Sequence, residues 1–164
     1  MWRVLGLILM LVSISAFGAV AEKPATPVSL LTSGPIEREV LITKYPQFKS
    51  SYEQWEPDAA DVAAMQALQG KAVKVILGLW CSDSHREVPR FIKLLKRSGV
   101  TLLSLEMVTV DRQKNDPKGV AKQYEVKYVP TIIVLEGDRE LGRFVESPKG
   151  ESMAQELAAI ASNN

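Results

Sequence analysis

One short run constrains the fold of this chain more than any other feature. Residues 71–79 are mostly apolar, rich in β-branched side chains and bounded by turn signals. Such a run is typical of a central strand that is covered on both faces of a sheet. Apolar residues then recur at helical spacing (Val88, Phe91, Ile92 and Leu95), and Ser98-Gly99 ends that pattern. The sequence therefore predicts a buried strand followed by an amphipathic helix.

The remaining patterns extend this unit in both directions. Residues 101–110 and 131–135 read as further strands, and residues 141–145 return as a fourth after a turn at 136–139. Helices are expected from Asp58 to Gly70, from Asp116-Pro117 onward, and from Ser147-Pro148 onward. Alternating strands and helices favour parallel pairing, and the final hairpin adds an antiparallel edge. We expect an α/β fold, with a mixed sheet of four to five strands and helices on both faces.

The N-terminal region differs in composition from the rest. Arg3 precedes an apolar stretch at 4–17, and Ala19-Val20-Ala21 has the small-residue pattern of a cleavage site. Residues 1–21 are therefore interpreted as a secretory signal peptide, with export across the inner membrane to the periplasm. A membrane anchor is the alternative, although a bilayer span needs ~20 apolar residues. Residues 22–59 are interpreted as a lead-in and N-terminal extension, and residues 60–164 as one domain.

The charge balance narrows the classes of partner. The chain has 20 basic and 19 acidic side chains, which argues against a nucleic-acid-binding face. The stretch from Asp111 to Lys114 is interpreted as solvated surface. Cys81 and His85 are the only cysteine and histidine, so the sequence has no Cys/His cluster of the kind that binds zinc. We expect no metal, no cofactor and, after cleavage of the signal peptide, no membrane association.

Cys81 is the main candidate for chemistry. It stands at the start of the predicted helix, where unpaired backbone N–H groups and the helix dipole favour a thiolate. Ser84, one turn further on, is expected to donate a hydrogen bond to the sulfur. His85 and Arg86 would add positive charge and Asp83 would oppose it, although His85 is also interpreted as a surface residue. An unpaired thiol in an exported chain suggests intermolecular pairing or a free reactive group.

These residues resemble the thioredoxin superfamily. Trp80-Cys81 follows the first central strand, Pro89 lies eight residues later, and Val129-Pro130-Thr131 precedes the hairpin. The resemblance covers roughly residues 60–164 and implies a thioredoxin-like three-layer sandwich. It also implies that Pro130 is cis and lies beside Cys81. By the same resemblance, Cys81 and Ser84 occupy the catalytic positions, and the substrate-binding positions are Trp80, Val129, Pro130 and Thr131.

The sequence departs from the family pattern in three places. Ser84 replaces the second cysteine, Val75 stands where many members carry a buried acid, and Met107 stands where they often carry a lysine. Dithiol reduction is therefore not expected. The first hypothesis is a monothiol, oxidoreductase-like protein that forms mixed disulfides with a protein or a low-molecular thiol or disulfide. The alternative is a binding or scaffold module that has lost redox chemistry. A dimer linked through Cys81 is a further expectation.

Overall fold

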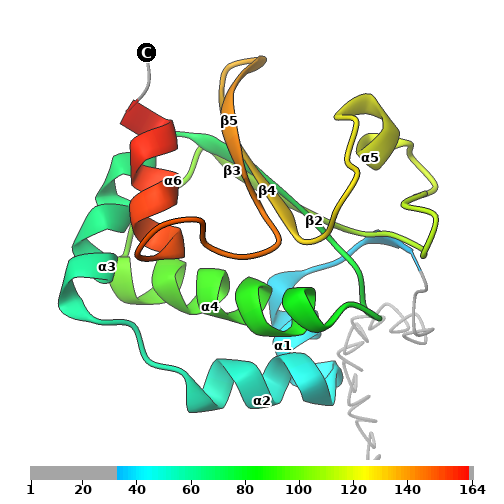
Figure 1. The fold of residues 1–164 in the computed structure, drawn as a ribbon, viewed down its shortest axis with the longest axis horizontal. Helices are drawn as coiled ribbons and strands as arrows, with labels where there is room; N and C mark the ends of the chain where they lie inside the picture. The colour runs from blue at the N-terminus through cyan, green and yellow to red at the C-terminus, as the bar shows by residue number, and fades with distance from the viewer. Residues whose placement is uncertain (1–32, 163–164) are drawn as a thin grey trace, which may run out of the picture.

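A computed structural model describes residues 33–162 of the chain (Figure 1). Its strands are β1 (Gly34–Pro35), β2 (Ala72–Leu77), β3 (Ser104–Thr109), β4 (Thr131–Glu136) and β5 (Arg139–Val145). Its helices are α1 (Arg38–Lys44), α2 (Pro46–Gln54), α3 (Ala59–Ala64), the 3-10 helix η1 (Met65–Leu68), α4 (Ser82–Ser98), α5 (Val120–Gln123) and α6 (Met153–Ser162). The predicted signal peptide at 1–21 and most of the predicted lead-in fall outside the described residues.

The strands form one mixed sheet in the order β1-β3-β2-β4-β5. Strands β2 and β3 are parallel, with Leu77 opposite Thr109 at their carboxyl ends. Strand β4 is antiparallel to β2, β5 is antiparallel to β4, and the short β1 is antiparallel to the end of β3. The predicted α/β architecture, a mixed sheet flanked by helices, is therefore confirmed. The edge strand β1 is new, because the sequence there predicts only a lead-in.

Strand β2 is buried on both faces, which explains its almost unbroken apolar sequence. Val73, Val75 and Leu77 belong to the main hydrophobic core. Ile76, on the opposite face, belongs to a second cluster that includes Ala121 of α5. Figure 1 shows α4 on one side of the sheet and the short α5 toward the other. The carboxyl end of β2 is thus held between two layers, and the loop that follows it has a rigid base.

Helix α4 begins and ends where the sequence predicts. Cys81 is its N-cap residue, and Gly99 follows its last turn with φ of 64°. Glycine is favoured there because this left-handed conformation strains residues that carry a Cβ. The apolar face of the helix, with Val88, Phe91 and Ile92, is buried in the main core. The helix is therefore fixed along its length, and its first turn holds Cys81 at the end of β2.

Three helix predictions need correction. The helix capped by Asp58 continues after α3 only as the 3-10 helix η1. The short helix begins at Val120 rather than at Asp116, because Asp116 binds backbone N–H groups further along and Gly119 adopts φ of 69°. The last helix begins at Met153, where the hydroxyl of Ser152 accepts a hydrogen bond from the N–H of Gln155. In each case a local turn replaces the first or last predicted helical turn.

The N-terminal extension contributes to the same core as the sheet. Its helices α1 and α2 carry Leu41 and Phe48, both fully buried among core residues. Figure 1 shows α2 lying beside α4. The ammonium of Lys93 on α4 donates hydrogen bonds of 2.6 Å to the carbonyl of Trp55 and 2.6 Å to the carboxylate of Glu56. The extension is therefore attached to α4 by both apolar and charged contacts.

None of the helices between residues 33 and 162 combines the length and apolar character needed to cross a bilayer.

Candidate functional site

Cys81 lies at the junction between β2 and α4. Its N–H donates to the carbonyl of Gly78 (3.0 Å), and its carbonyl accepts from the N–H of His85 (3.0 Å). The first bond closes a tight turn after the strand, and the second begins the hydrogen bonding of α4. Cys81 is partly exposed. The thiol is thus fixed by the backbone on both sides and remains within reach of solvent.

The tight turn requires a glycine at position 78. A Cβ on Gly78 would lie 2.9 Å from Cε2 of Trp80 and 3.2 Å from Cβ of Cys81. The first distance is shorter than a normal van der Waals contact, so the indole would have to move. The absence of a side chain at Gly78 therefore leaves room for both the indole ring of Trp80 and the side chain of Cys81 to pack against its Cα atom.

The thiol faces a chain segment that is distant in sequence. The Sγ atom of Cys81 lies 3.1 Å from the carbonyl oxygen of Val129, and the thiol is the donor of this hydrogen bond. The peptide bond between Val129 and Pro130 is cis. Pro130 and Thr131 are both buried, and the hydroxyl of Thr131 donates to the carbonyl of Tyr128 (2.7 Å). Of the predicted substrate-binding residues, Val129 is thus hydrogen-bonded to the sulfur through its backbone carbonyl.

Ser84 lies in the first turn of α4, as the sequence predicts, but it makes a different hydrogen bond from the one expected. Its side chain is fully buried, and its hydroxyl oxygen accepts a hydrogen bond of 3.1 Å from the N–H of Gly78. The expected hydrogen bond to the sulfur of Cys81 is not among those formed by the described residues. The serine instead connects the first turn of α4 to the β2–α4 turn. Its observed contact supports the loop that carries the thiol.

His85 also points away from the thiol. Its Nε2 atom lies 2.7 Å from the carbonyl oxygen of Leu79, and its ring packs edge-on against Phe48 with centroids 4.9 Å apart. A carbonyl oxygen only accepts, so Nε2 carries the hydrogen in this contact. His85 is therefore half-buried between α2 and the loop before Cys81. Its contacts do not present it as a base for the sulfur.

The charges on the first turns of α4 compensate one another. Arg86 pairs with Asp83 (2.9 Å) and with the buried carboxylate of Glu87 (2.5 Å), and Arg90 also approaches Glu87 (3.4 Å). The hydrogen bond to Glu87 is the chief reason why the pKa of the Arg86 guanidinium is raised. The positive charge of Arg86 is thus directed to carboxylates on its own helix. Its expected effect on Cys81 is correspondingly reduced.

Trp80 is held beside the thiol as a platform. Its indole N–H donates to the carbonyl of Val110 (3.1 Å), in the loop that follows β3. The guanidinium carbon of Arg112 lies 5.0 Å from the centre of an aromatic ring of Trp80, and the ammonium of Lys114 lies 5.8 Å from it. These distances are typical of cation–π contacts. Arg112 and Lys114, interpreted above as solvated surface, therefore border the site.

The predicted parallel pairing of β2 and β3 could have placed Arg112 and Lys114 near the thiol. Leu77 and Thr109 are opposite one another at the strand ends, and the N–H of Val110 donates to the carbonyl of Leu77 (2.9 Å). Loops that follow parallel strands meet at the carboxyl edge of a sheet, where ligands commonly bind in α/β folds. The loop after β3 was therefore a candidate from the strand order alone.

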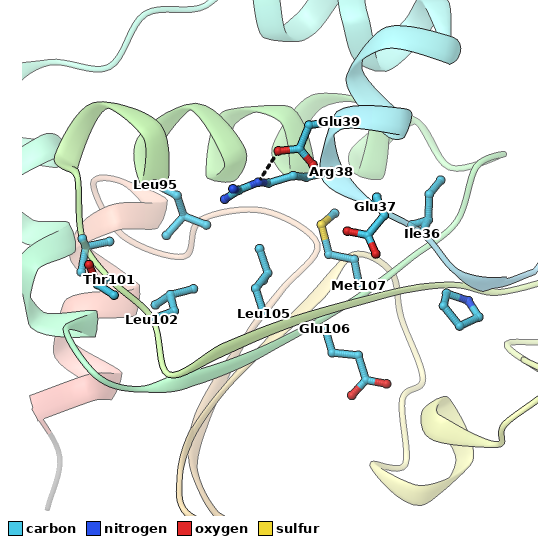
Figure 2. Close-up of a pocket in the computed structure, with 12 residues that line it drawn as sticks. Ile36, Glu37, Arg38, Glu39, Leu95, Thr101, Leu102, Leu105, Glu106 and Met107 are labelled. Atoms are coloured by element: carbon cyan, nitrogen blue, oxygen red, sulfur yellow. Dashed lines mark hydrogen bonds and ion pairs between the residues drawn. The ribbon is translucent and has the colours of Figure 1, made fainter. Parts of the chain in front are cut away.

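A cavity of about 530 Å³ lies elsewhere in the molecule, between the start of α1, the end of α4 and β3. Figure 2 shows Leu95, Leu102 and Leu105 lining it, with Arg38 hydrogen-bonded to Glu39 above them (2.7 Å). None of the predicted site residues lines this cavity. In residues 33–162 no three His, Cys, Asp or Glu side chains gather in a way that would hold a metal ion.

Comparison with known proteins supports the fold only. No protein-family model and no curated protein matches the chain. A solved protein of unknown function from Pseudomonas aeruginosa is similar in structure, with a TM-score of 0.53 and 16% identity over 79% of this chain and 83% of that one. The thioredoxin Deadhead from Drosophila melanogaster gives a TM-score of 0.40 and 18% identity over 57% and 80% of the two chains. Thioredoxin O2 from Arabidopsis thaliana gives 0.39 and 16% over 62% and 84%.

At this identity the likeness to the Pseudomonas aeruginosa protein concerns the fold alone, and the two thioredoxins carry no argument because their TM-scores are 0.40 and 0.39. The described residues form an α/β fold, a mixed five-stranded sheet flanked by helices, with one cysteine, and the function must be argued from the site.

Proposed function

We propose that this protein acts through the single thiol of Cys81 in thiol–disulfide exchange, forming a mixed disulfide with its client. The observation that supports this most directly is the position of the sulfur. Cys81 is partly exposed at the first turn of α4, and its sulfur lies 3.1 Å from the carbonyl of Val129, a buried residue of a second chain segment.

The proposed reaction has a simple balance. The Cys81 thiol loses its proton to solvent, and the thiolate attacks one sulfur of a client disulfide. A new sulfur–sulfur bond forms, the old one breaks, and the second client sulfur leaves as a thiolate. Ser84 has no thiol, so a second protein cysteine does not release the adduct. Release requires an external thiol or a second thiol on the client, and the mixed disulfide is expected to persist without one.

The direct test exposes the purified protein to 2-hydroxyethyl disulfide at neutral pH and measures the intact mass. We expect one added half-disulfide on the native chain, which dithiothreitol removes, and none on Cys81→Ser. Alkylation rates of Cys81 measured across pH then report the thiolate fraction and the access of the sulfur together. A native chain that gains no adduct, although its thiol is alkylated after unfolding, would contradict the proposal.

A binding module without redox chemistry is the second candidate. It is favoured by the serine at position 84, which has no thiol and leaves Cys81, the single cysteine of the sequence, without a resolving partner. In that case Cys81→Ala would keep the cellular role and the client binding of the native protein. Loss of both in a folded Cys81→Ala variant would instead favour the thiol function.

Export and dimer formation belong to the same proposal. We propose that residues 1–21 direct the chain to the periplasm and that the mature protein begins at Glu22; N-terminal sequencing of the fractionated protein tests this. A partly exposed lone thiol also supports a Cys81-linked dimer under mild oxidation. Non-reducing gels should show this dimer in the native chain and not in Cys81→Ser.

A further inference from the structure

The side chains around Trp80 form a positive surface next to the thiol. The indole is fixed by its hydrogen bond to Val110 (3.1 Å), and Arg112 and Lys114 both lie over its rings, at 5.0 and 5.8 Å. Two like charges on one aromatic platform repel one another. Neither of them makes an ion pair with an acid elsewhere in residues 33–162. An anion between or beside them would relieve this repulsion.

The acids of the same loop face its backbone. The carboxylate of Asp111 accepts from the N–H of Asn115 (2.8 Å), and this bond is the chief reason why the pKa of Asp111 is lowered, with a smaller effect from Lys114. Asp116 accepts from the N–H groups of Val120 (3.1 Å) and Ala121 (2.9 Å). The carboxylates of Asp111 and Asp116 are thus bound mainly by backbone N–H groups, and neither forms an ion pair with Arg112 or Lys114.

The other chain segment at the thiol carries one cation and one aromatic ring, and the N–H of the acid Glu146 donates to the carbonyl of Pro130 in that segment (2.8 Å). Lys127 is exposed and Tyr128 is 57% exposed, and both directly precede Val129, whose carbonyl contacts the sulfur. The nearest acid on α4, Asp83, is paired with Arg86 at 2.9 Å. The cations whose contacts place them at the site are therefore Arg112 and Lys114, over the ring of Trp80, the residue directly before Cys81.

We infer that the disulfides preferred by Cys81 carry carboxylate groups beside the sulfur–sulfur bond, and that Arg112 and Lys114 on the Trp80 platform select them. This inference rests on the proposed thiol function and names its substrate class. The exchange step is the one given above: the Cys81 thiolate bonds to one substrate sulfur and the other leaves as a thiolate. The two cations attract the anionic disulfide and stabilise its complex with the protein, and they take no part in making or breaking bonds.

The test uses three small disulfides that differ in charge: 3,3′-dithiodipropionate, 2-hydroxyethyl disulfide and cystamine. The rate constant for adduct formation at Cys81 is measured for each at one pH in low salt. Each is divided by the rate of the same disulfide with 2-mercaptoethanol, which removes differences in leaving-group chemistry. We expect the anionic disulfide to exceed the cationic one by about 10-fold, the lower end of electrostatic steering effects.

Two double variants locate the effect. Arg112→Gln with Lys114→Gln removes the cations on Trp80, and the anionic-to-cationic ratio should fall to near one. Lys44→Gln with Lys96→Gln is the matched control, because it removes the same two positive charges from exposed lysines in the last turns of α1 and α4 that form no ion pair within residues 33–162. The control should keep the ratio of the native protein. Raising the salt to 0.5 M should shrink that ratio, since the Debye length falls well below ~8 Å.

The possible results separate this inference from the proposed function. If all three disulfides form adducts at equal normalised rates, the charge selection is wrong and the thiol function stands. If both double variants lower the ratio equally, the effect is one of net charge and the assignment to Arg112 and Lys114 is wrong. If no disulfide reacts with Cys81, the proposed function itself fails.

A peptide arm then distinguishes the two sources of such a substrate. The same measurement is made with a short peptide disulfide flanked by glutamates and with its lysine-flanked counterpart. A ratio larger than that of the small disulfides indicates a protein client, and an equal ratio indicates that low-molecular dicarboxylate disulfides suffice. A preference for the lysine-flanked peptide would overturn the inference.

Discussion

Two of the regions that place a cation on an aromatic ring, the contact between α2 and α4 and the surface beside the thiol, differ in what completes the contact. Where α2 meets α4, the ammonium of Lys93 lies 5.2 Å from the ring centre of Tyr52 and is hydrogen-bonded to the carboxylate of Glu56 (2.6 Å). Beside the thiol, Arg112 and Lys114 lie over Trp80, and neither forms an ion pair with a carboxylate of residues 33–162.

The difference separates structural charge from charge that remains free for a ligand. Lys93 is only 6% exposed, so its desolvation must be offset by close partners within the protein. Arg112 is exposed and stays hydrated, so the fold does not need to neutralise it. Removal of charge where α2 meets α4 should therefore alter stability, whereas removal of charge beside the thiol should alter reactivity.

The largest expected effect comes from the apolar part of the α2–α4 contact. Phe48 is fully buried and packs against His85, so Phe48→Ala leaves a cavity behind the loop that carries Cys81. We expect the free energy of unfolding to fall by about 3–5 kcal/mol, as for other buried phenylalanines. Urea denaturation measures this change. The control is Leu103→Ala, which removes a side chain that is 71% exposed and should alter stability by less than ~0.5 kcal/mol.

A smaller loss from Phe48→Ala, no greater than that of Leu103→Ala, would mean that the extension does not stabilise the domain. The charges where α2 meets α4 could then not be called structural, because α2 would contribute nothing to the stability of the domain.

The second prediction concerns the turn beside the thiol. In Gly78→Ala the new Cβ would meet Trp80 at 2.9 Å, so the indole is displaced along with its cations. Strain of this kind costs about 1–3 kcal/mol of stability. The larger consequence is for Cys81, whose preference for anionic disulfides should weaken because the platform has moved.

Gly150→Ala is the matched control, since a Cβ there meets nothing within 4 Å. It should change neither the unfolding midpoint nor the substrate preference by a measurable amount. A Gly78→Ala variant that keeps the full anionic preference would show that the position of the indole does not matter for it.

The elements of the fold were predictable because their signals are local. The apolar face of α4 and the glycine after it are written in neighbouring residues, as is the run that forms β2. Asp58 was also assigned correctly as a cap, since its carboxylate accepts from the N–H of Asp61 (2.7 Å) three residues later. The start of α5 was wrong because one aspartate can bind several N–H groups, and the sequence does not say which.

The surroundings of the thiol were less predictable because they depend on contacts between distant segments. Ser84 was expected at the sulfur, but its hydroxyl reaches back to Gly78, a choice that only the geometry of the turn decides. Arg112 was interpreted as solvated surface, since nothing near it in sequence is aromatic. Its contact with Trp80 arises from the parallel pairing of β2 and β3, which brings two loops to one edge of the sheet.

The smallest expected effect is the dependence of stability on pH at the α2–α4 contact. Hydrogen bonds from Lys93 and then Arg97 lower the pKa of Glu56 below its ordinary value. A carboxyl whose folded-state pKa is depressed stabilises the fold fully above its unfolded-state pKa and loses that contribution as the pH falls through the folded-state value. Glu56→Gln should therefore be slightly less stable than the native protein at pH 7 and indistinguishable from it in strong acid.

Urea midpoints measured from pH 7 down to the acid limit test this convergence. Glu53→Gln, which removes an exposed acid on α2 with only a distant pairing to Lys49 (3.9 Å), should stay parallel to the native curve. Because Glu56 is solvated, its contribution is discounted by water and salt, so the gap should also narrow at high ionic strength. A gap that is constant with pH would mean that Lys93 is held by the carbonyl of Trp55 alone. The carboxylate would then be incidental to the contact, and the contrast with Arg112 and Lys114 would lie in burial, not in the presence of a counter-ion.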